Sequence, residues 1–384
     1  MSRPVRIADI PTPALIVDVA ALERNLARMA AFFSDGPCRL RPHVKAHKTP
    51  EIARRQLAAG GCVGLTCATI GEAEWVSDLC DDLLIANELI GPGKCERVAQ
   101  LAGRVRQRAR ERSGANGGER ADESGIVTVA VDSVAGARAL STAATGAGVT
   151  IGVLVDVNVG QERCGVLPGD EALTLARQVA QTPGLRLRGV MGYEGHVQPV
   201  RARDDRALAA QRSMMALVTT ADLLRENGLP CEVVSAGGTG TYDLSGRFPG
   251  VTEIQAGSYA LMDTDYREVG VPFEQAFWAL GTVISRPVPT RCAADCGHKA
   301  VTKDHALPAV AGIPGARITA LNDEHAVIAV PADAAVTIGD RIRLVPSHTD
   351  PTINLHDKLY AIEGERVVDV WPVAARGYRR VEFQ

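Results

Sequence analysis

The sequence lacks several features that would place a protein in a class at once. Its 42 lysines and arginines nearly balance its 45 aspartates and glutamates, for a formal net charge of only −3. No long-range positive field therefore attracts a nucleic-acid backbone. No uncharged apolar run reaches the length of about 18 residues that a membrane-spanning helix needs. The segment MSRPVRIADIPTPALIVD has no apolar core followed by a cleavage site of small residues. We expect neither nucleic-acid binding, nor membrane insertion, nor secretion.

The nine cysteines form no CxxC pair, and their number is odd. Scattered thiols of this kind suit a reducing compartment better than a disulfide framework, so we expect a cytoplasmic protein. The hydrophobic share of 46% and the charged share of 23% are ordinary for a soluble globular protein. Because 384 residues exceed the size at which one core usually stops growing, we expect a large domain and a smaller one.

Between residues 39 and 260, eight short β-rich runs alternate with segments of helical spacing. This alternation predicts a closed parallel (β/α)8 barrel of the TIM type, with an open doubly wound sheet as the alternative architecture. The eight runs are LRPHVK (40–45), VGLTC (63–67), DLLIAN (82–87), IVTVAV (126–131), IGVLVDV (151–157), LRGVMGY (187–193), EVVSA (232–236) and TEIQAG (252–257).

The two ends of the chain differ from the predicted barrel. Residues 1–24 contain a strand, PALIVD, that has no partner among the eight, and residues 269–384 contain short β-runs punctuated by glycine and proline. We expect the barrel over 25–268 and a C-terminal β-domain after it. Residues 104–125 are dense in charge, glycine and serine, which predicts a surface insertion that is mobile at its middle. A nucleic-acid-binding arm is less favoured because acidic residues are interspersed among its arginines.

The octapeptide RPHVKAHK places Arg41, His43, Lys45 and His47 on one face if the segment is a strand. A lysine held in a crowded barrel mouth near other cations has a lowered pKa, which makes its amine a nucleophile. The competing interpretation is an edge strand with solvated charges. Active sites of barrels gather at the carboxyl ends of the strands, where this segment is expected to lie.

Two further motifs carry chemistry. The run SAGGTGTY (235–242) follows a strand, and its backbone amides could cradle a phosphate, although a plain tight turn explains it too. In PSHTDPTINLHD (346–357), His348 and Asp350 supply an imidazole and a carboxylate two residues apart. Such a pair suits an open metal site completed by water or substrate, while a hydrogen-bonded histidine on a turn is the structural alternative.

Taken in order, several motifs resemble those of the D-threonine aldolase and D-serine dehydratase family. The resemblance runs over essentially the whole chain, apart from 104–125. It implies a fold type III pyridoxal-phosphate enzyme, with an alanine-racemase-like barrel, a β-domain that the N-terminal strand joins, and a homodimer. The motifs are RPHVKAHK, DVNVGQERCGV, GVMGYEGHVQ, SAGGTGTY, EIQAGSYALMD, DCGHKAVTKDHALP and PSHTDPTINLHD.

By this resemblance, Lys45 is the Schiff-base lysine and Lys48 is a surface neighbour. The glycine loop and Tyr259 hold the cofactor phosphate, and Arg163 and Tyr193 lie near the pyridine ring. His348 and Asp350 match the family's ligands for a divalent metal, which could be manganese, magnesium, cobalt or zinc. The expected cofactor-binding residues are Lys45, Arg163, Tyr193, Ser235, Gly237, Gly238, Thr239, Gly240, Thr241 and Tyr259.

The implied reaction is retro-aldol cleavage of a D-β-hydroxy-α-amino acid into glycine and an aldehyde. Asp350 favours the aldolase branch, because the dehydratase branch typically has cysteine at that position. His196 of YEGH is the expected base, with a purely structural histidine as the alternative. Cleavage of 3-hydroxy-D-aspartate and dehydration of D-serine or 3-hydroxyaspartate stay open as alternatives. An amino-acid racemase and a non-catalytic pyridoxal-phosphate carrier are less favoured.

Overall fold

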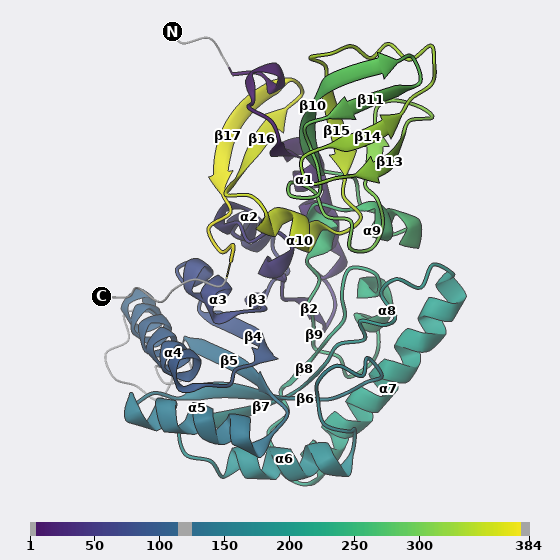
Figure 1. Cartoon of the computed structure of the whole chain (residues 1–384). Helices are drawn as coiled ribbons and strands as arrows, with labels where there is room; N and C mark the ends of the chain where they lie inside the picture. The colour runs from purple at the N-terminus through teal and green to yellow at the C-terminus, as the bar shows by residue number, and fades with distance from the viewer. Residues whose placement is uncertain (1–4, 114–124, 378–384) are drawn as a thin grey trace. The chain divides into compact units, whose positions relative to one another are not determined.

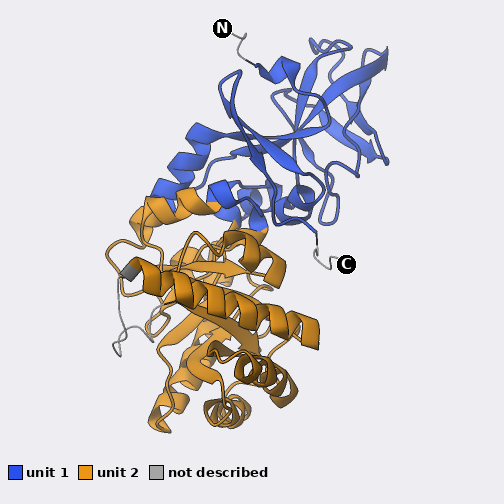
Figure 2. Cartoon of the chain, turned by 90° about the vertical axis from the view of Figure 1, so that its left-hand side faces the viewer, with its two compact units in different colours: residues 1–29, 46–52, 258–379 blue, residues 30–45, 53–257, 380–384 orange. Residues whose placement is uncertain are grey.

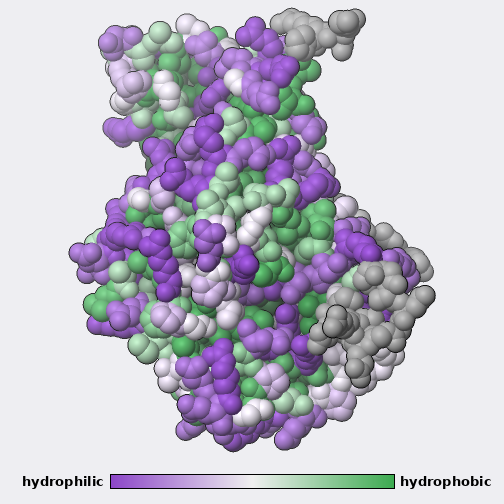
Figure 3. All heavy atoms as spheres, turned by 180° about the vertical axis from the view of Figure 1, so that it is seen from behind, coloured by the Kyte–Doolittle hydropathy of each residue, from purple (hydrophilic) through white to green (hydrophobic). Residues whose placement is uncertain are grey.

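The computed structural model describes residues 5–113 and 125–377, which form two compact units. One unit consists of residues 5–29, 46–52 and 258–377, and the other of residues 30–45, 53–113 and 125–257 (Figure 2). None of the helices within the described ranges combines the length and the apolar character that a bilayer crossing demands. The face drawn in Figure 3 mixes hydrophilic and hydrophobic residues.

The second unit is built on an eight-stranded sheet in the order β2-β9-β8-β7-β6-β5-β4-β3, and every neighbouring pair is parallel. Parallel bridges from Leu40 to Cys62 and from His43 to Thr66 join the first strand to the second and close the sheet. The predicted barrel is therefore confirmed. The strands are β2 (Arg39–Leu40), β3 (Leu65–Cys67), β4 (Asp82–Glu88), β5 (Ile126–Val131), β6 (Ile151–Asp156), β7 (Leu185–Gly192), β8 (Val233–Ala236) and β9 (Glu253–Ile254).

Helices cover the outside of these strands (Figure 1), so both faces of β6 are buried, as its β-branched run IGVLVD requires. One apolar cluster takes a residue from each of five successive strands: Leu84, Ala130, Leu154, Met191 and Val233. The helices are α2 (Pro50–Ala59), α3 (Ile70–Val76), α4 (Pro92–Ser113), α5 (Val134–Gly146), α6 (Asp170–Ala180), α7 (Arg203–Glu226) and α8 (Tyr242–Ser245).

Two local predictions were wrong. The predicted strand over 40–45 ends at Leu40, and residues Val44–Ala46 form the 3-10 helix η2 instead. Pro42 has no amide hydrogen for a strand ladder, which disfavours a longer strand there. Residues 104–113 of the predicted insertion belong to helix α4, because Val105 and Ala109 bury one face of a segment otherwise rich in helix-forming arginine. Residues 114–124 of that insertion lie outside the described residues.

The first unit contains a nine-stranded sheet whose main path is β13-β14-β11-β10-β1-β16-β17. The N-terminal strand β1 (Ala14–Asp18) lies inside it, antiparallel to β10 and parallel to β16. The other strands are β10 (Phe277–Val288), β11 (Arg291–Ala294), β12 (Ala309–Ala311), β13 (Arg317–Leu321), β14 (Ala326–Ala329), β15 (Arg341–Val345), β16 (Lys358–Glu363) and β17 (Arg366–Pro372). Helix α1 (Val19–Phe32) follows β1. Helix α9 (Thr264–Val269) precedes β10, and α10 (Thr349–Asn354) lies between β15 and β16 in the sequence.

All nine cysteines are free thiols. Most are buried, and burial raises the pKa of the thiols of Cys38 and Cys296 to about 12. These thiols are therefore protonated and unreactive at neutral pH. The absence of disulfides agrees with the scattered spacing of the cysteines in the sequence.

Candidate active site

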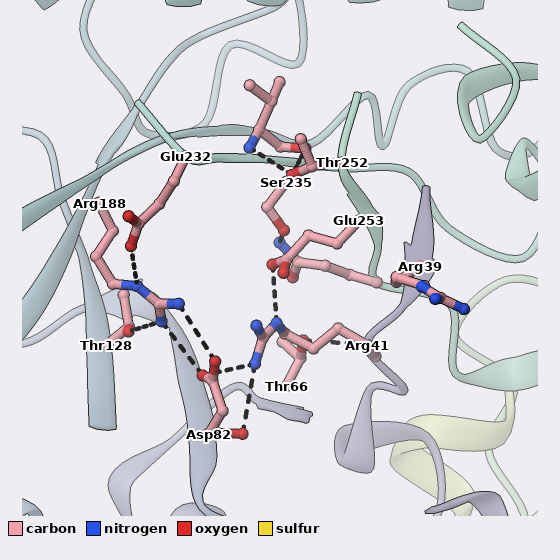
Figure 4. Close-up of polar contacts among 12 residues, drawn as sticks. Arg39, Arg41, Thr66, Asp82, Thr128, Arg188, Glu232, Ser235, Thr252 and Glu253 are labelled. Carbon is pink, nitrogen blue, oxygen red and sulfur yellow. Dashed lines mark hydrogen bonds and ion pairs between the residues drawn. The ribbon is translucent and has the colours of Figure 1, made fainter. Parts of the chain in front are cut away.

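A buried ion-pair network fills part of the barrel interior (Figure 4). Arg41 is 2% exposed, and it donates from Nε to Glu253 Oε1 at 2.8 Å and from Nη1 to Asp82 Oδ1 at 2.9 Å. Arg188 of β7 donates to the same Asp82 carboxylate at 3.3 Å and to Thr128 Oγ1 at 2.8 Å. Burial disfavours the Asp82 carboxylate, but the guanidinium groups of Arg41 and Arg188 lower its pKa. The charge of Arg41 is thus neutralised inside the protein.

Lys45 lies in η2, directly after the first strand of the barrel, and its side chain is half-buried. Its backbone amide donates to Nδ1 of His43 at 3.4 Å, which orients an imidazole that is only 8% exposed. Lys48 was expected at the surface, but it is also half-buried, with a left-handed φ of 50°. The two lysines are therefore similar in exposure. They differ because Lys45 lies in a 3-10 helix, whereas Lys48 follows it with a left-handed backbone.

The glycine loop after β8 is held by two side chains from the turn after β7. The Glu194 carboxylate accepts from Thr241 Oγ1 at 2.7 Å, from Ser245 Oγ at 2.6 Å and from the Gly237 amide at 3.1 Å. Gln198 accepts from the Gly240 amide at 2.8 Å and donates to Thr241 Oγ1 at 2.8 Å. Sequence analysis missed this support, although a glutamate and a glutamine within the motif YEGHVQ were its signal.

Small residues are required in this loop because it packs closely against its neighbours. Gly237 has a φ of 75°, and a Cβ on it would lie 2.6 Å from Ile254 Cδ1. A Cβ on Gly238 would lie 2.7 Å from Gln198 Oε1, and one on Gly240 would lie 2.6 Å from the Gln198 carbonyl oxygen. Thr239, between these glycines, is 2% exposed. The loop is thus compact and buried, with a fixed backbone.

Arg163 and Tyr193 lie together, with the guanidinium carbon of Arg163 5.7 Å from the centroid of the Tyr193 ring. The exposed imidazole of His196 lies over the backbone of Gly160, because a Cβ there would be only 3.1 Å from His196 Cε1. Ser235 is fully buried in β8, where its hydroxyl accepts from Gln255 Nε2 at 2.8 Å.

Acidic groups gather at the carboxyl ends of β4, β5 and β6. Burial and repulsion from Glu88 raise the pKa of Asp156 to about 8. One ligand-type atom from each of Glu88, Asp132 and Cys164 lies within 4.8 Å of the others. Asp156 is therefore protonated at neutral pH, which reduces the repulsion within this acidic group.

The other unit contains Tyr259 and the predicted metal ligands. Tyr259, in the 3-10 helix η4 (Ser258–Ala260), is 1% exposed, and its ring centroid lies 5.5 Å from that of Phe273. His348 precedes the first turn of α10, and Nδ1 of its ring lies 2.7 Å from Asp304 Oδ2. The ring of His305 stacks on that of His348, with centroids 4.3 Å apart.

Asp304, His305 and His348 each offer a ligand atom within 4.8 Å of the other two. Sequence analysis assigned no role to Asp304 and His305, although they lie in the quoted stretch DCGHKAVTKDHALP. Asp350 lies in the first turn of α10, close enough that its charge adds to the effect of burial in raising the pKa of Asp263 to about 6. Asp263 in turn accepts from the Thr349 amide at 3.1 Å, which fixes the start of α10.

Comparisons with known proteins agree with this architecture. Residues 17–265 match the model of the alanine racemase N-terminal domain, and residues 276–362 match the model named "Putative serine dehydratase domain". A D-threonine aldolase from an Arthrobacter species is 40% identical over 97% of this chain and 95% of its own length. A 3-hydroxy-D-aspartate aldolase from Paracoccus denitrificans is 34% identical over 96% of this chain and 93% of its own length.

Among solved structures, the D-threonine aldolase from Filomicrobium marinum matches with a TM-score of 0.89 and 40% identity, covering 98% of each chain. Both units are therefore present in a relative of known structure. The chain belongs to the D-threonine aldolase and D-serine dehydratase family of fold type III pyridoxal-phosphate enzymes.

Proposed function

We propose that this protein is a pyridoxal-phosphate- and divalent-metal-dependent lyase of the D-threonine aldolase type, which cleaves D-β-hydroxy-α-amino acids into glycine and an aldehyde. The observation that carries the proposal is the 40% identity to a D-threonine aldolase over 97% of the chain. The predicted lysine, arginine, tyrosine and glycine loop all occur in the barrel that this similarity covers. We further propose a cytoplasmic homodimer, as the family resemblance implies.

The donor set of the barrel fits pyridoxal phosphate. Lys45 would hold the cofactor aldehyde, the loop from Gly237 to Thr241 would hold its phosphate, and Arg163 and Tyr193 would lie near its ring. The buried Ser235 would support this arrangement from β8. When bound, the cofactor supplies an electron sink for the pair released by Cα–Cβ cleavage. The position of Lys45 directly after the first barrel strand supports its role, because active sites of barrels gather at the carboxyl ends of the strands.

The residues around His348 fit a divalent metal. We propose His348 and Asp350 as ligands, with Asp304 and His305 as the neighbouring groups that complete or orient the site. Imidazole and carboxylate donors suit manganese, magnesium, cobalt and zinc. When bound, such a metal lowers the pKa of a substrate hydroxyl. The hydrogen bond of 2.7 Å that Nδ1 of His348 donates to Asp304 Oδ2 supports the assignment, because it leaves Nε2 of that ring for the metal.

We propose His196 as the base that takes the β-hydroxyl proton. Its ring is exposed at the turn after β7, so the imidazole is accessible to a substrate proton. Glu194, two residues earlier in that turn, is fully buried and anchors it. An anchored turn fixes the backbone that carries His196, which favours general-base catalysis.

Cleavage of 3-hydroxy-D-aspartate to glycine and glyoxylate is the second candidate activity. It is favoured by the 34% identity to a 3-hydroxy-D-aspartate aldolase over 96% of the chain. Dehydration of D-serine or 3-hydroxyaspartate would also use the cofactor and metal, but it would release ammonia and a keto acid. A racemase or a cofactor carrier would need no metal.

One product assay distinguishes these activities. The purified protein, loaded with pyridoxal phosphate and manganese, is incubated separately with D-threonine, 3-hydroxy-D-aspartate and D-serine, and glycine, oxaloacetate, pyruvate and ammonia are measured. Glycine from D-threonine in excess of that from 3-hydroxy-D-aspartate supports the proposal, and the reverse ratio selects the second candidate. Pyruvate and ammonia from D-serine with no glycine from either other substrate would refute both aldolase assignments.

A further inference from the structure

We infer that Glu194, together with Gln198, is a positioning residue that holds the glycine loop 237–241 ready for the cofactor phosphate. The inference rests on the proposed cofactor site and deepens it. It assigns a role to two side chains that do not belong to the proposed cofactor contacts. It also changes the role of a third, Thr241.

Polar groups of the loop are already hydrogen-bonded to two buried side chains, Glu194 and Gln198. Glu194 is 0% exposed and Gln198 is 5% exposed. Between them they make five hydrogen bonds of 2.6–3.1 Å, of which four reach residues 237–241 and the fifth reaches Ser245 just after the loop. A buried carboxylate without such donors would carry a large desolvation cost, so the acid and the loop stabilise each other.

The state of the Thr241 hydroxyl follows from its two hydrogen-bond partners. Its Oγ1 lies 2.7 Å from Glu194 Oε1, and Gln198 Nε2 donates to the same Oγ1 at 2.8 Å. Because the amide nitrogen of Gln198 can only donate, Thr241 Oγ1 accepts from it and directs its single hydroxyl proton to Glu194 Oε1. This hydroxyl therefore joins the loop to Glu194 and does not donate to a phosphate.

A loop that is ordered before the ligand arrives favours phosphate binding. Gly237, Gly238 and Gly240 lose more backbone freedom on ordering than other residues would, so a loose loop would oppose phosphate binding. A loop that is already ordered by buried side chains avoids this cost when the ligand arrives. Loss of Glu194 should consequently weaken the affinity gained from the phosphate group. It should leave unchanged the affinity gained from the lysine and the pyridine ring.

The test compares two ligands that differ only in the phosphate. Full-length protein freed of cofactor is titrated with pyridoxal 5′-phosphate and with pyridoxal, and binding is followed by the visible absorbance of the lysine-bound ligand. The readout is the ratio of the two dissociation constants, pyridoxal over pyridoxal phosphate. In Glu194→Gln, an amide nitrogen must face a donor, so we expect this ratio to fall by about tenfold or more while pyridoxal affinity stays nearly unchanged.

Two further variants complete the design. Glu226→Gln makes the same charge change at the exposed end of α7 and should keep the wild-type ratio. Thr241→Val keeps the shape of the side chain but removes the hydroxyl, so it should lower the ratio in the same direction, and it decides the question if Glu194→Gln does not fold.

The outcomes separate the inference from the proposed function. A wild-type protein that binds pyridoxal phosphate no better than pyridoxal would refute the phosphate site itself. If the wild type prefers pyridoxal phosphate, and Glu194→Gln and Thr241→Val keep that preference, only the inference about Glu194 is overturned. A parallel loss of affinity for both ligands would also overturn it, because that result indicates general damage to the fold.

Discussion

At the scale of single residues, the barrel mouth depends on a carboxyl group that keeps its proton. Burial and the neighbouring Glu88 raise the pKa of Asp156 to about 8, far above the value of about 3.9 expected in the unfolded chain. Between these two values the folded protein holds a proton that the unfolded protein has lost. The free energy of unfolding contributed by this residue therefore falls as the pH rises through that window.

Asp156→Asn should remove this pH dependence, because an amide has no proton to lose. We expect the stability of the variant relative to wild type to increase between pH 5 and pH 8, by at most about 1.4 kcal/mol per pH unit. Urea unfolding at several pH values measures the difference, with Glu226→Gln as a surface control. A difference that stays constant or shrinks with rising pH would contradict the assigned proton.

A second residue-scale prediction concerns Asp304, whose carboxylate lies 2.7 Å from Nδ1 of His348. Removing the charge that orients a ligating histidine typically weakens metal binding by about 10–100-fold. Asp304→Asn should therefore bind manganese more weakly by this factor in a calorimetric titration. Asp333→Asn, on an exposed turn, should bind as wild type does. Unchanged affinity in Asp304→Asn would show that His348 needs no such partner.

At the scale of elements, the sequence predicted the number and order of the barrel strands, because most buried parallel strands are continuous β-branched runs separated by helical spacing. It failed where a local feature was decided by distant contacts. The 3-10 helix at Val44–Ala46 is one case. The grouping of Asp304 and His305 with His348 is another, since about 40 residues separate them in the chain and no local pattern reports the contact.

An irregularity in strand β7 accompanies the ion-pair network of Arg188 and Asp82. In the pairing of β6 with β7, Val153 faces Leu187 and Leu154 faces Gly189, so Arg188 is an extra residue that bulges from the ladder. The bulge accompanies the hydrogen bonds from Arg188 to Asp82 and Thr128. Gly189 permits it with a φ of 145°.

Gly189→Ala should be strongly destabilising, because a Cβ there would overlap the Val233 carbonyl oxygen of the neighbouring strand. Overpacking together with an unfavourable φ predicts a loss of about 1–3 kcal/mol or more in the free energy of unfolding. Gly93→Ala, in helix α4 with no atom near its Cβ, should be neutral or slightly stabilising. Equal stability of the two variants in urea unfolding would contradict the account of the bulge.

At the scale of the whole molecule, the motifs of the sequence predicted the family, and the similarity to a D-threonine aldolase over 97% of the chain confirms it. The two units explain why one motif could not suffice. The lysine and the glycine loop belong to the barrel unit, and the His348 group belongs to the strand-rich unit. The family resemblance rests on the order of all these motifs along the chain. That order indicated that the motifs of both units belong to one enzyme family.

The central claim is that Lys45 carries the cofactor of a D-threonine aldolase-type enzyme. The measurement that tests it most directly is glycine release from D-threonine by wild type, Lys45→Ala and Lys48→Asn, each loaded with pyridoxal phosphate and manganese, with the visible absorbance recorded beforehand. Asparagine tolerates the left-handed φ of 50° at position 48. The account predicts that Lys45→Ala loses both the absorbance and glycine release, while Lys48→Asn keeps the absorbance. A Lys45→Ala protein with wild-type absorbance and glycine release would contradict it.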